Sequence, residues 1–419
     1  MRGRLPFLVT LMAVPGVAHA AQGFPDIKLS GIVDFRAAAT DDTASWLDEG
    51  LGKVRYGAGK DGDGRVIARL AQADVVARAR LSWSLQAVLQ LQYDKDQRLP
   101  VDVVEAYLAY DKAPTSPFSV RGRVGVFYPP VSLENRGVAW TSVYGITPSA
   151  INTWVGEELR IVGGEATMEY STPDNRFSLT GALYEYNDTA GTLLSWRGWA
   201  LHDRQTPLFD HIDMPQGLAA FSPTSLFGRQ EALAKPFIEI DDRPGYYLDA
   251  RWQALDYGEV RIMHYDNRGR VPEHAPGQYD WDTTFEAAGI RLFLPARMEF
   301  LAQGMTGSTR MEIGFGRPEY VDADFRSAYA LLSKAFGENQ CVSARVDLFS
   351  VDDEDQSGVD DNSEKGHAFT VDYMTTLGEH HHIGFELLRV TSDRPERATI
   401  GLAPKVTELL FQAQYRFQF

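Results

Sequence analysis

The sequence is poor in three features that define common protein classes. It contains one cysteine, Cys341, among 419 residues, which excludes an internal disulfide framework and a cysteine-rich metal site. No stretch approaches the roughly 18 uninterrupted apolar residues of a membrane-spanning helix. Basic residues are also fewer than acidic ones, with 41 Lys and Arg against 57 Asp and Glu. The resulting net charge of −16 argues against a nucleic-acid partner, which needs a concentrated basic face.

Motifs for catalysis, cofactor binding and metal binding are also missing. The chain has neither a Gly-x-Ser-x-Gly sequence nor a phosphate-binding glycine loop. Three consecutive histidines at 380–382 lack the spaced carboxylate or cysteine set of a metal site, and a solvated turn is the simpler interpretation. The acidic stretches at 61–64 and 352–361 lack the full ligand spacing of a calcium loop. We therefore expect a protein that is not an enzyme and has no cofactor, catalytic residue or metal ligand.

The first residues have the pattern of an export signal. Two arginines precede an apolar run at residues 5–17, and Ala18 and Ala20 provide the small residues that a signal peptidase requires. The alternative is a buried N-terminal helix, but charge, apolar run and cleavage box occur in the order of a signal peptide. The sequence thus predicts that residues 1–20 are a cleaved signal peptide and that residues 21–419 form one domain.

The final stretch, residues 405–419, alternates between apolar and polar side chains. One side carries Leu409, Phe411, Ala413, Tyr415, Phe417 and Phe419, and the other carries Glu408, Gln412, Gln414, Arg416 and Gln418. A period of two residues predicts a β-strand. Its aromatic face could lie against a protein core or against lipid, so the neighbouring segments must decide.

The same alternation recurs and predicts sixteen strands. They begin at residue 26 and continue at 66–80, 81–93, 101–111, 118–128, 160–171, 176–188, 245–255, 258–267, 283–294, 297–306, 320–335, 340–351, 365–376, 381–391 and 405–419. Polar faces rich in glutamine, as in residues 81–93, suit water better than a second dry core.

The connections between these strands alternate in length. Links after even-numbered strands are short, as at 172–175 and 256–257, whereas 129–159 and 189–244 are among the long links after odd-numbered strands. This asymmetry and the even strand count predict an all-β fold, a transmembrane antiparallel β-barrel of about 16 strands with short periplasmic turns and long extracellular loops. Neither a soluble sandwich nor a propeller predicts such alternation.

Aromatic residues lie at or near many predicted strand ends, where the interfacial girdles of a barrel are expected. These are Trp83, Tyr93, Tyr110, Tyr128, Tyr170, Tyr246, Trp252, Tyr415 and Phe419. Because a sheet can cross lipid only without free edges, the first and last strands must pair. We expect Tyr415, Phe417 and Phe419 to close the barrel.

These features together resemble the bacterial porin class. A signal peptide, about sixteen amphipathic strands and a terminal strand ending in Phe are typical of it, and the resemblance implies that the barrel-assembly machinery reads this last strand. Residues 105–110 and 123–135 resemble, more locally, the Gly-x-Phe-x-x-Pro-x-x-x-Glu signature of the phosphate-selective porins of the O and P type. That resemblance implies a pore lined by arginines and lysines, although no such ladder can be assigned here.

The loop at 129–159 is the candidate constriction. Two tryptophans and several branched apolar residues are unusual for a solvated loop, and they stand among the polar residues Glu134, Arg136, Glu157 and Glu158. We expect the loop to fold inward, with its apolar side on the inner wall and its polar side towards the channel. Packing at a trimer interface or at the barrel rim is the alternative.

Strand parity predicts which charges face the lumen. It assigns inward positions to Arg121, Arg123, Arg326, Arg345, Glu105 and Asp347, among other residues of both signs. Such opposed charges orient charged solutes and set ion selectivity. For any single pair, a salt bridge that stiffens the wall is the alternative to a binding site.

The sequence therefore predicts a porin in the bacterial outer membrane, a water-filled channel for passive diffusion of small polar or charged solutes. Anions such as phosphate are among the candidate solutes. An outer-membrane enzyme, or a structural or adhesive barrel using the loop at 189–244, remains an alternative. The expected partners are membrane lipid and lipopolysaccharide, the assembly machinery and further copies of the chain in a homotrimer.

Overall fold

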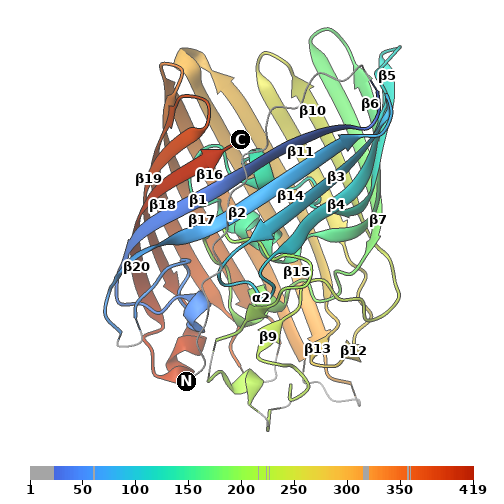
Figure 1. Cartoon of the computed structure of the whole chain (residues 1–419). Helices are drawn as coiled ribbons and strands as arrows, with labels where there is room; N and C mark the ends of the chain where they lie inside the picture. The colour runs from blue at the N-terminus through green and yellow to red at the C-terminus, as the bar shows by residue number, and fades with distance from the viewer. Residues whose placement is uncertain are drawn as a thin grey trace, which may run out of the picture.

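Sixteen strands of the computed structural model close into one antiparallel barrel, which confirms the predicted fold class (Figure 1). The structure describes residues 23–59, 62–215, 217–222, 224–225, 227–314, 320–355, 358 and 360–419. The predicted signal peptide lies outside the described residues. No described helix is long and apolar enough to cross a membrane.

The barrel strands follow one another around the wall in chain order. They are β1 (Asp26–Thr40), β2 (Val66–Arg80), β3 (Leu85–Tyr93), β4 (Asp102–Asp111), β5 (Phe118–Phe127), β6 (Ile161–Ser171), β7 (Asn175–Glu185), β10 (Gly245–Ala254), β11 (Gly258–Asp266), β14 (Asp282–Leu294), β15 (Met298–Glu312), β16 (Tyr320–Phe336), β17 (Gln340–Asp353), β18 (Glu364–Leu377), β19 (His381–Asp393) and β20 (Lys405–Gln418). Every predicted strand has its counterpart among them.

The loops contain the remaining elements. These are the two-stranded sheets β8 (Ile212–Asp213) with β9 (Leu233–Ala234) and β12 (His274–Ala275) with β13 (Gln278–Tyr279), the helices α1 (Ala150–Glu158) and α2 (Thr192–Trp196), and short 3-10 turns at Trp46–Asp48, Val138–Trp140, Ala219–Phe221, Pro295–Arg297 and Pro395–Ile400. Three long loops matter below: L1 (residues 41–65), L3 (residues 128–160) and L4 (residues 186–244). In Figure 1, the long loops gather at the lower end of the barrel and the short turns at the upper end.

The first and last strands form the seam of the barrel. Their register pairs Ile32 with Gln418 and Phe35 with Tyr415. At the short-turn end, Gly31 and Phe419 exchange two backbone hydrogen bonds of 3.0 and 3.1 Å. Closure therefore leaves neither β1 nor β20 as a free sheet edge.

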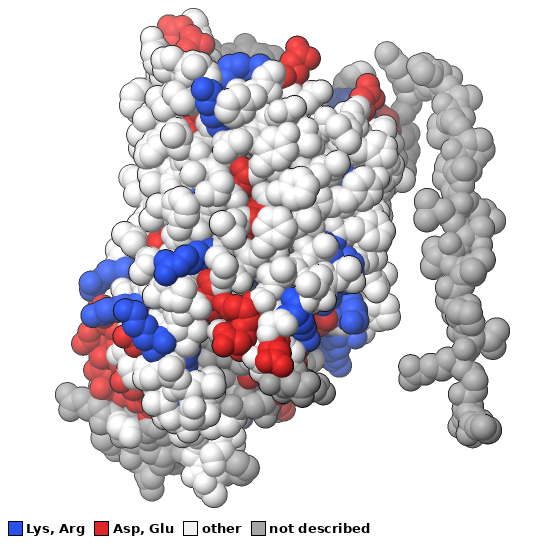
Figure 2. All heavy atoms as spheres, turned by 90° about the vertical axis from the view of Figure 1, so that its left-hand side faces the viewer, with Lys and Arg blue, Asp and Glu red and all other residues white. Residues whose placement is uncertain are grey.

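The outer face of the barrel is apolar around its middle. Figure 2 shows a broad belt with few charges, and below it Lys, Arg, Asp and Glu gather towards the long-loop end. Trp83, Trp252 and Tyr415 are exposed on this outer face, as the girdle interpretation requires. The assignment of Tyr128 to the girdle was wrong, because this residue is buried inside the barrel and stacks on Trp140, with 4.2 Å between ring centroids.

Candidate functional site: the barrel lumen

L3 leaves the wall at the end of β5, after a position that only glycine can occupy. Gly125 has φ of +134°, and a Cβ there would lie 2.2 Å from the carbonyl oxygen of Ala106 on the neighbouring strand. Beyond Phe127 the chain turns away from the sheet and returns to it at Ile161. This glycine is the one in the Gly-x-Phe sequence that begins the local porin-like signature.

The helix α1 gives L3 an apolar core inside the barrel. Ser149 caps its first turn by accepting a hydrogen bond from Asn152 N at 3.3 Å. The ring of Trp154 packs edge-on against Phe285 of β14 and Phe325 of β16, with centroid distances of 5.7 and 5.3 Å. The inner wall is thus apolar where the helix rests on it, and the barrel has a hydrophobic core inside its lumen.

Arg345 and Asp347 of β17 attach L3 to the wall. Arg345 donates to the carbonyl oxygens of Thr147 and Pro148 at 2.7 and 3.0 Å, and Asp347 accepts from Ala150 N at 3.2 Å. The two charged groups also pair with each other at 2.7 Å. Both side chains are buried, so they anchor the loop and do not present their charges to open water.

Two further carboxylates of the wall complete this attachment. Asp372 of β18 accepts from Ile146 N at 3.0 Å, and Glu386 of β19 accepts from Thr147 N at 2.7 Å and from its hydroxyl at 2.8 Å. The turn before α1 is therefore held by side chains from three adjacent strands, β17 to β19.

Glu134 and Arg136 do not line an open channel, because both side chains form hydrogen bonds with other groups of the protein. Glu134 is fully buried and accepts from Ser149 N and Asn152 Nδ2, both at 2.7 Å, so it stabilises the start of α1. Arg136 is partly exposed and hydrogen bonds to the hydroxyl of Tyr144, which donates to Glu299 at 2.6 Å.

Glu157 joins L3 to L4. Its carboxylate accepts two hydrogen bonds from Arg197 at 2.6 and 2.7 Å and lies 2.8 Å from His202 Nε2. Because His202 Nδ1 accepts from Arg204 N at 3.2 Å, Nε2 carries the ring proton. Burial opposes ionisation of Glu157, but Arg197 and His202 lower its pKa to about 2.

Glu158 makes a second connection between the same loops. It accepts hydrogen bonds from Trp154 Nε1 at 2.6 Å, Leu193 N at 3.0 Å and Gly191 N at 3.1 Å. Burial raises its pKa to about 7 despite these donors. The neighbouring glutamates of α1 therefore fix L4 from two directions.

Residues 199–206 of L4 cross the lumen. Leu201 N donates to Lys53 O of L1 at 2.7 Å, and Gln205 donates to Ala139 O of L3 at 2.8 Å. Between them, the Asp203 carboxylate accepts from Arg36 of β1 at 2.8 Å and from Arg55 of L1 at 3.0 Å.

Asp203 acts as an anion held by two arginines. Burial by itself opposes its ionisation, yet the guanidinium groups of Arg36 and Arg55 hold the pKa of Asp203 well below its usual range. Beside it, a cavity of about 10 Å³ lies between L3, L4 and Arg416 of β20. This volume has room for about one water molecule.

A band of arginines covers another part of the inner wall, near the short-turn end. Each pairs with a carboxylate on a neighbouring strand: Arg121 with Glu169 at 2.7 Å, Arg123 with Glu165 at 2.9 Å, Arg251 with Glu259 at 2.6 Å, Arg261 with Asp249 at 2.8 Å and Arg291 with Glu259 at 3.4 Å. We call these five arginines the basic band.

Four of the five arginines of the basic band are more exposed than the carboxylates they pair with. Arg291 is the exception, because its side chain is 13% exposed and it also lies 3.8 Å from Glu299, whose side chain is 37% exposed. The side chain of Arg121 is 41% exposed against 11% for Glu169, and that of Arg251 is 30% exposed against 4% for Glu259. The carboxylates therefore lie behind the guanidinium groups, so this wall presents positive charge to the water inside the barrel.

The predicted site residues thus fall into separate groups. Arg121 and Arg123 belong to the basic band, and Glu105 lies next to it, accepting from Tyr128 N at 3.2 Å. The remaining predicted residues stabilise L3 or attach it to the wall and to L4: Glu134, Arg136, Glu157, Glu158, Arg345 and Asp347. The inward assignment of Arg326 was wrong, because its side chain is exposed on the outer face, 3.8 Å from Asp352.

Sequence reasoning missed Asp203 and Arg55, which belong to different loops, and Arg291 of the basic band. Inward parity on β14 could have found Arg291, since Phe285 and Ala287 share its face. No sequence pattern predicts the meeting of L1 with L4.

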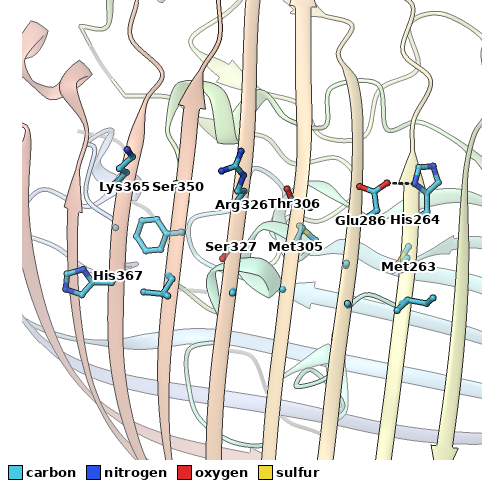
Figure 3. A pocket seen from close by; sticks show the side chains of 18 of the residues that line it. Met263, His264, Glu286, Met305, Thr306, Arg326, Ser327, Ser350, Lys365 and His367 are labelled. Carbon is cyan, nitrogen blue, oxygen red and sulfur yellow. Dashed lines mark hydrogen bonds and ion pairs between the residues drawn. The ribbon is translucent and has the colours of Figure 1, made fainter.

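A large concavity lies on the outer wall, with lining residues from β7 to β20. It has a volume of about 1180 Å³, and small residues such as Ala250, Ala288 and Ala328 form its floor. Figure 3 shows His264 and Glu286, which form a hydrogen bond of 3.1 Å at its border. Because this hollow faces away from the lumen, it has no part in a path through the barrel.

The chain is similar in fold to solved outer-membrane proteins. It matches the outer membrane channel DcaP of Acinetobacter baumannii with a TM-score of 0.59 and 10% identity, covering 96% of this chain and 99% of that one. An anion-selective porin from Comamonas acidovorans matches with a TM-score of 0.50 and 12% identity, over 94% and 99% of the two chains.

The outer membrane protein OmpT of Vibrio cholerae, in a trimer form, matches with a TM-score of 0.51 and 7% identity, over 95% of this chain and 100% of that one. No family model and no curated protein matches the sequence. These likenesses and the closed sheet define a porin-like barrel of the outer-membrane type.

Proposed function

We propose that this protein is an outer-membrane channel for small anionic solutes, with L4 closing the path in this structure. The basic band carries the proposal, since four of its five arginines are more exposed than the carboxylates they pair with. A positively charged wall attracts anions and raises their local concentration. Phosphate is the first solute to test, because bidentate guanidinium groups suit its oxygens.

Closure by L4 follows from the contacts of Asp203. Its carboxylate occupies the space between Arg36 and Arg55, where a solute anion would find its strongest attraction. Conduction then requires L4 to leave this position, so we expect a channel that is closed for part of the time.

Planar bilayers test the proposal. We expect stepwise conductance and, in a KCl gradient, a reversal potential that favours chloride. Arg251→Gln removes one exposed charge of the basic band and should move the reversal potential towards zero. Arg310→Gln is the matched control. Arg310 is partly exposed on the outer face of β15, since its neighbour Thr309 faces inward.

A structural barrel is the second candidate, and the contacts by which L4 holds L1, L3 and the wall inside the barrel favour it. If a correctly folded protein and its Asp203→Asn variant both fail to conduct, the channel proposal is wrong and the structural function is supported. Correct folding can be checked by the different gel migration of boiled and unboiled protein.

The proposed partners follow from the class of barrel. The apolar belt implies membrane lipid, the charged long-loop end fits lipopolysaccharide, and the last strand with Phe417 and Phe419 is the proposed signal for the barrel-assembly machinery. We also propose a homotrimer, which native mass spectrometry in mild detergent tests by the mass of the complex.

A further inference from the structure

Three carboxylates meet where L4 joins the barrel wall. Asp188, Glu239 and Asp241 each bring one oxygen into a group in which all these atoms lie within 4.8 Å of one another. Asp188 follows β7, whereas Glu239 and Asp241 precede β10. The cluster therefore joins the two ends of L4, which are 53 positions apart at Asp188 and Asp241.

The pairing of the strands explains this convergence. Tyr184 of β7 lies opposite Gly245 of β10, so the residues just beyond these positions must lie near each other. Asp188 strengthens the contact, because its carboxylate accepts the backbone N–H groups of Ile240 and Asp241. The carboxylates are thus fixed by backbone contacts and not by an attraction among themselves.

Several oxygens at this place have no partner. Asp241 is 8% exposed, and its Oδ2 is buried without a hydrogen bond. Oε1 of Glu239 is also buried without a hydrogen bond. Among the described residues, no Lys, Arg or His forms an ion pair with the three carboxylates. Buried acceptors without donors are costly, and buried charges are normally paired or bound to a metal.

A fourth carboxyl group lies close to the cluster. Asp280 is fully buried, has an unpartnered Oδ1, and interacts electrostatically with Asp188 and Asp241. Burial, followed by repulsion from Glu239 and Asp241, raises the pKa of Asp188 to about 7. Burial and the neighbouring aspartates raise the pKa of Asp280 to about 8.

We propose that Asp188, Glu239 and Asp241 form a Ca²⁺ site that clamps the two ends of L4 together. The ligands are all oxygens, which favours a hard cation over zinc or copper. Ca²⁺ accepts six to eight oxygens in flexible geometry, so three carboxylates can bind it together with water. The proposed site does not depend on whether the barrel conducts.

Calorimetry with the full chain in detergent tests the site. The protein is freed of divalent ions with EDTA and titrated with CaCl₂ at pH 8.5, where the carboxylates ionise. We expect one Ca²⁺ bound per chain and a melting temperature that rises with Ca²⁺ concentration. Asp241→Asn and Glu239→Gln should each weaken binding at least tenfold, while Asp213→Asn, an exposed position of L4 outside the cluster, should bind like the original protein.

The melting temperatures without Ca²⁺ separate a metal site from a structural cluster. In EDTA, Asp241→Asn should melt at or above the temperature of the original protein, because it removes repulsion. The proposal is overturned if Ca²⁺ neither binds nor raises the melting temperature of the original protein, or if both variants keep its affinity. It is also overturned if both variants melt lower in EDTA, which would show that the carboxylates serve only as hydrogen-bond acceptors.

Discussion

Asp203 of L4 and Arg36 of β1 lie 167 positions apart in the sequence and form an ion pair inside the barrel, with 2.8 Å between Oδ2 and Nη2. Arg36 also donates to Gln412 of β20 at 2.7 Å and lies 3.2 Å from Asp34. The loop is thus attached to the strands that form the seam of the barrel. The proposed closure of the lumen by L4 therefore depends on this ion pair.

Asp203→Asn should open the channel more often. Removing one partner of a buried ion pair costs about 3–5 kcal/mol, because the other charge stays buried and uncompensated. We expect a higher open probability and stronger anion preference in single-channel recordings, since Arg36 and Arg55 become available to solutes. Asp213→Asn is the control within the same loop, and equal open probability of both variants would contradict the closing function of Asp203.

Glu259→Gln should increase anion preference. Glu259 accepts from both Arg251 and Arg291, so its neutralisation leaves two guanidinium groups of the basic band without their carboxylate. The reversal potential in a KCl gradient should move towards the equilibrium potential of chloride. Glu286→Gln changes the same charge on the outer wall and should leave the potential as it was; an identical shift in both variants would point to an effect of net charge alone.

Acid should weaken the contact between L3 and L4. The pKa of Glu157 is about 2 in the folded protein and about 4.3 in an unfolded chain, so its ionised form stabilises the contact fully above pH 4.3. This stability is lost as pH falls from about 4.3 through 2. Mean conductance should rise over that range, and Glu157→Gln should show the raised conductance already at pH 7. Conductance that stays constant down to pH 2 would contradict this function of Glu157.

Arg345→Lys should loosen L3 without changing the net charge. Lysine has no planar fork and cannot replace the bonds to Thr147 O, Pro148 O and Asp347 together. With about 1.5–3 kcal/mol for each hydrogen bond to a charged group, we expect a loss of about 3 kcal/mol in the free energy of unfolding. Urea unfolding in lipid vesicles measures it, with Arg310→Lys on the outer wall as the control that should stay within about 0.5 kcal/mol.

The sequence predicts the barrel well because its strands carry a local signal. Alternation along residues 405–419 assigns Phe411 and Tyr415 to the outer face, and the structure agrees. The alternation misleads on β16, where Phe325 faces the lumen and Arg326 faces outward. The cause is L3, since Trp154 needs an apolar partner on the inner wall and so reverses the usual pattern there.

The site is less predictable because its contacts join distant segments. Parity places Arg123 and Arg345 inside the barrel, yet only the structure distinguishes an arginine that faces water from one that holds a loop. The carboxylate cluster had a weak signal, as Asp188 follows one strand and Asp241 precedes its neighbour in the sheet. Without the pairing of β7 with β10, these residues are 53 positions apart and unrelated.

The crossing segment of L4 has hydrogen bonds to L1, L3 and the barrel wall at the same time. Asp203 cannot move away from Arg36 while Leu201 and Gln205, on either side of it, keep their hydrogen bonds to backbone carbonyl groups of L1 and L3. These contacts must therefore break together, so intermediate positions of the segment are short-lived. The ionic current should then switch abruptly between two levels, with dwell times set by the free energy of the whole group of contacts and not by any one of them.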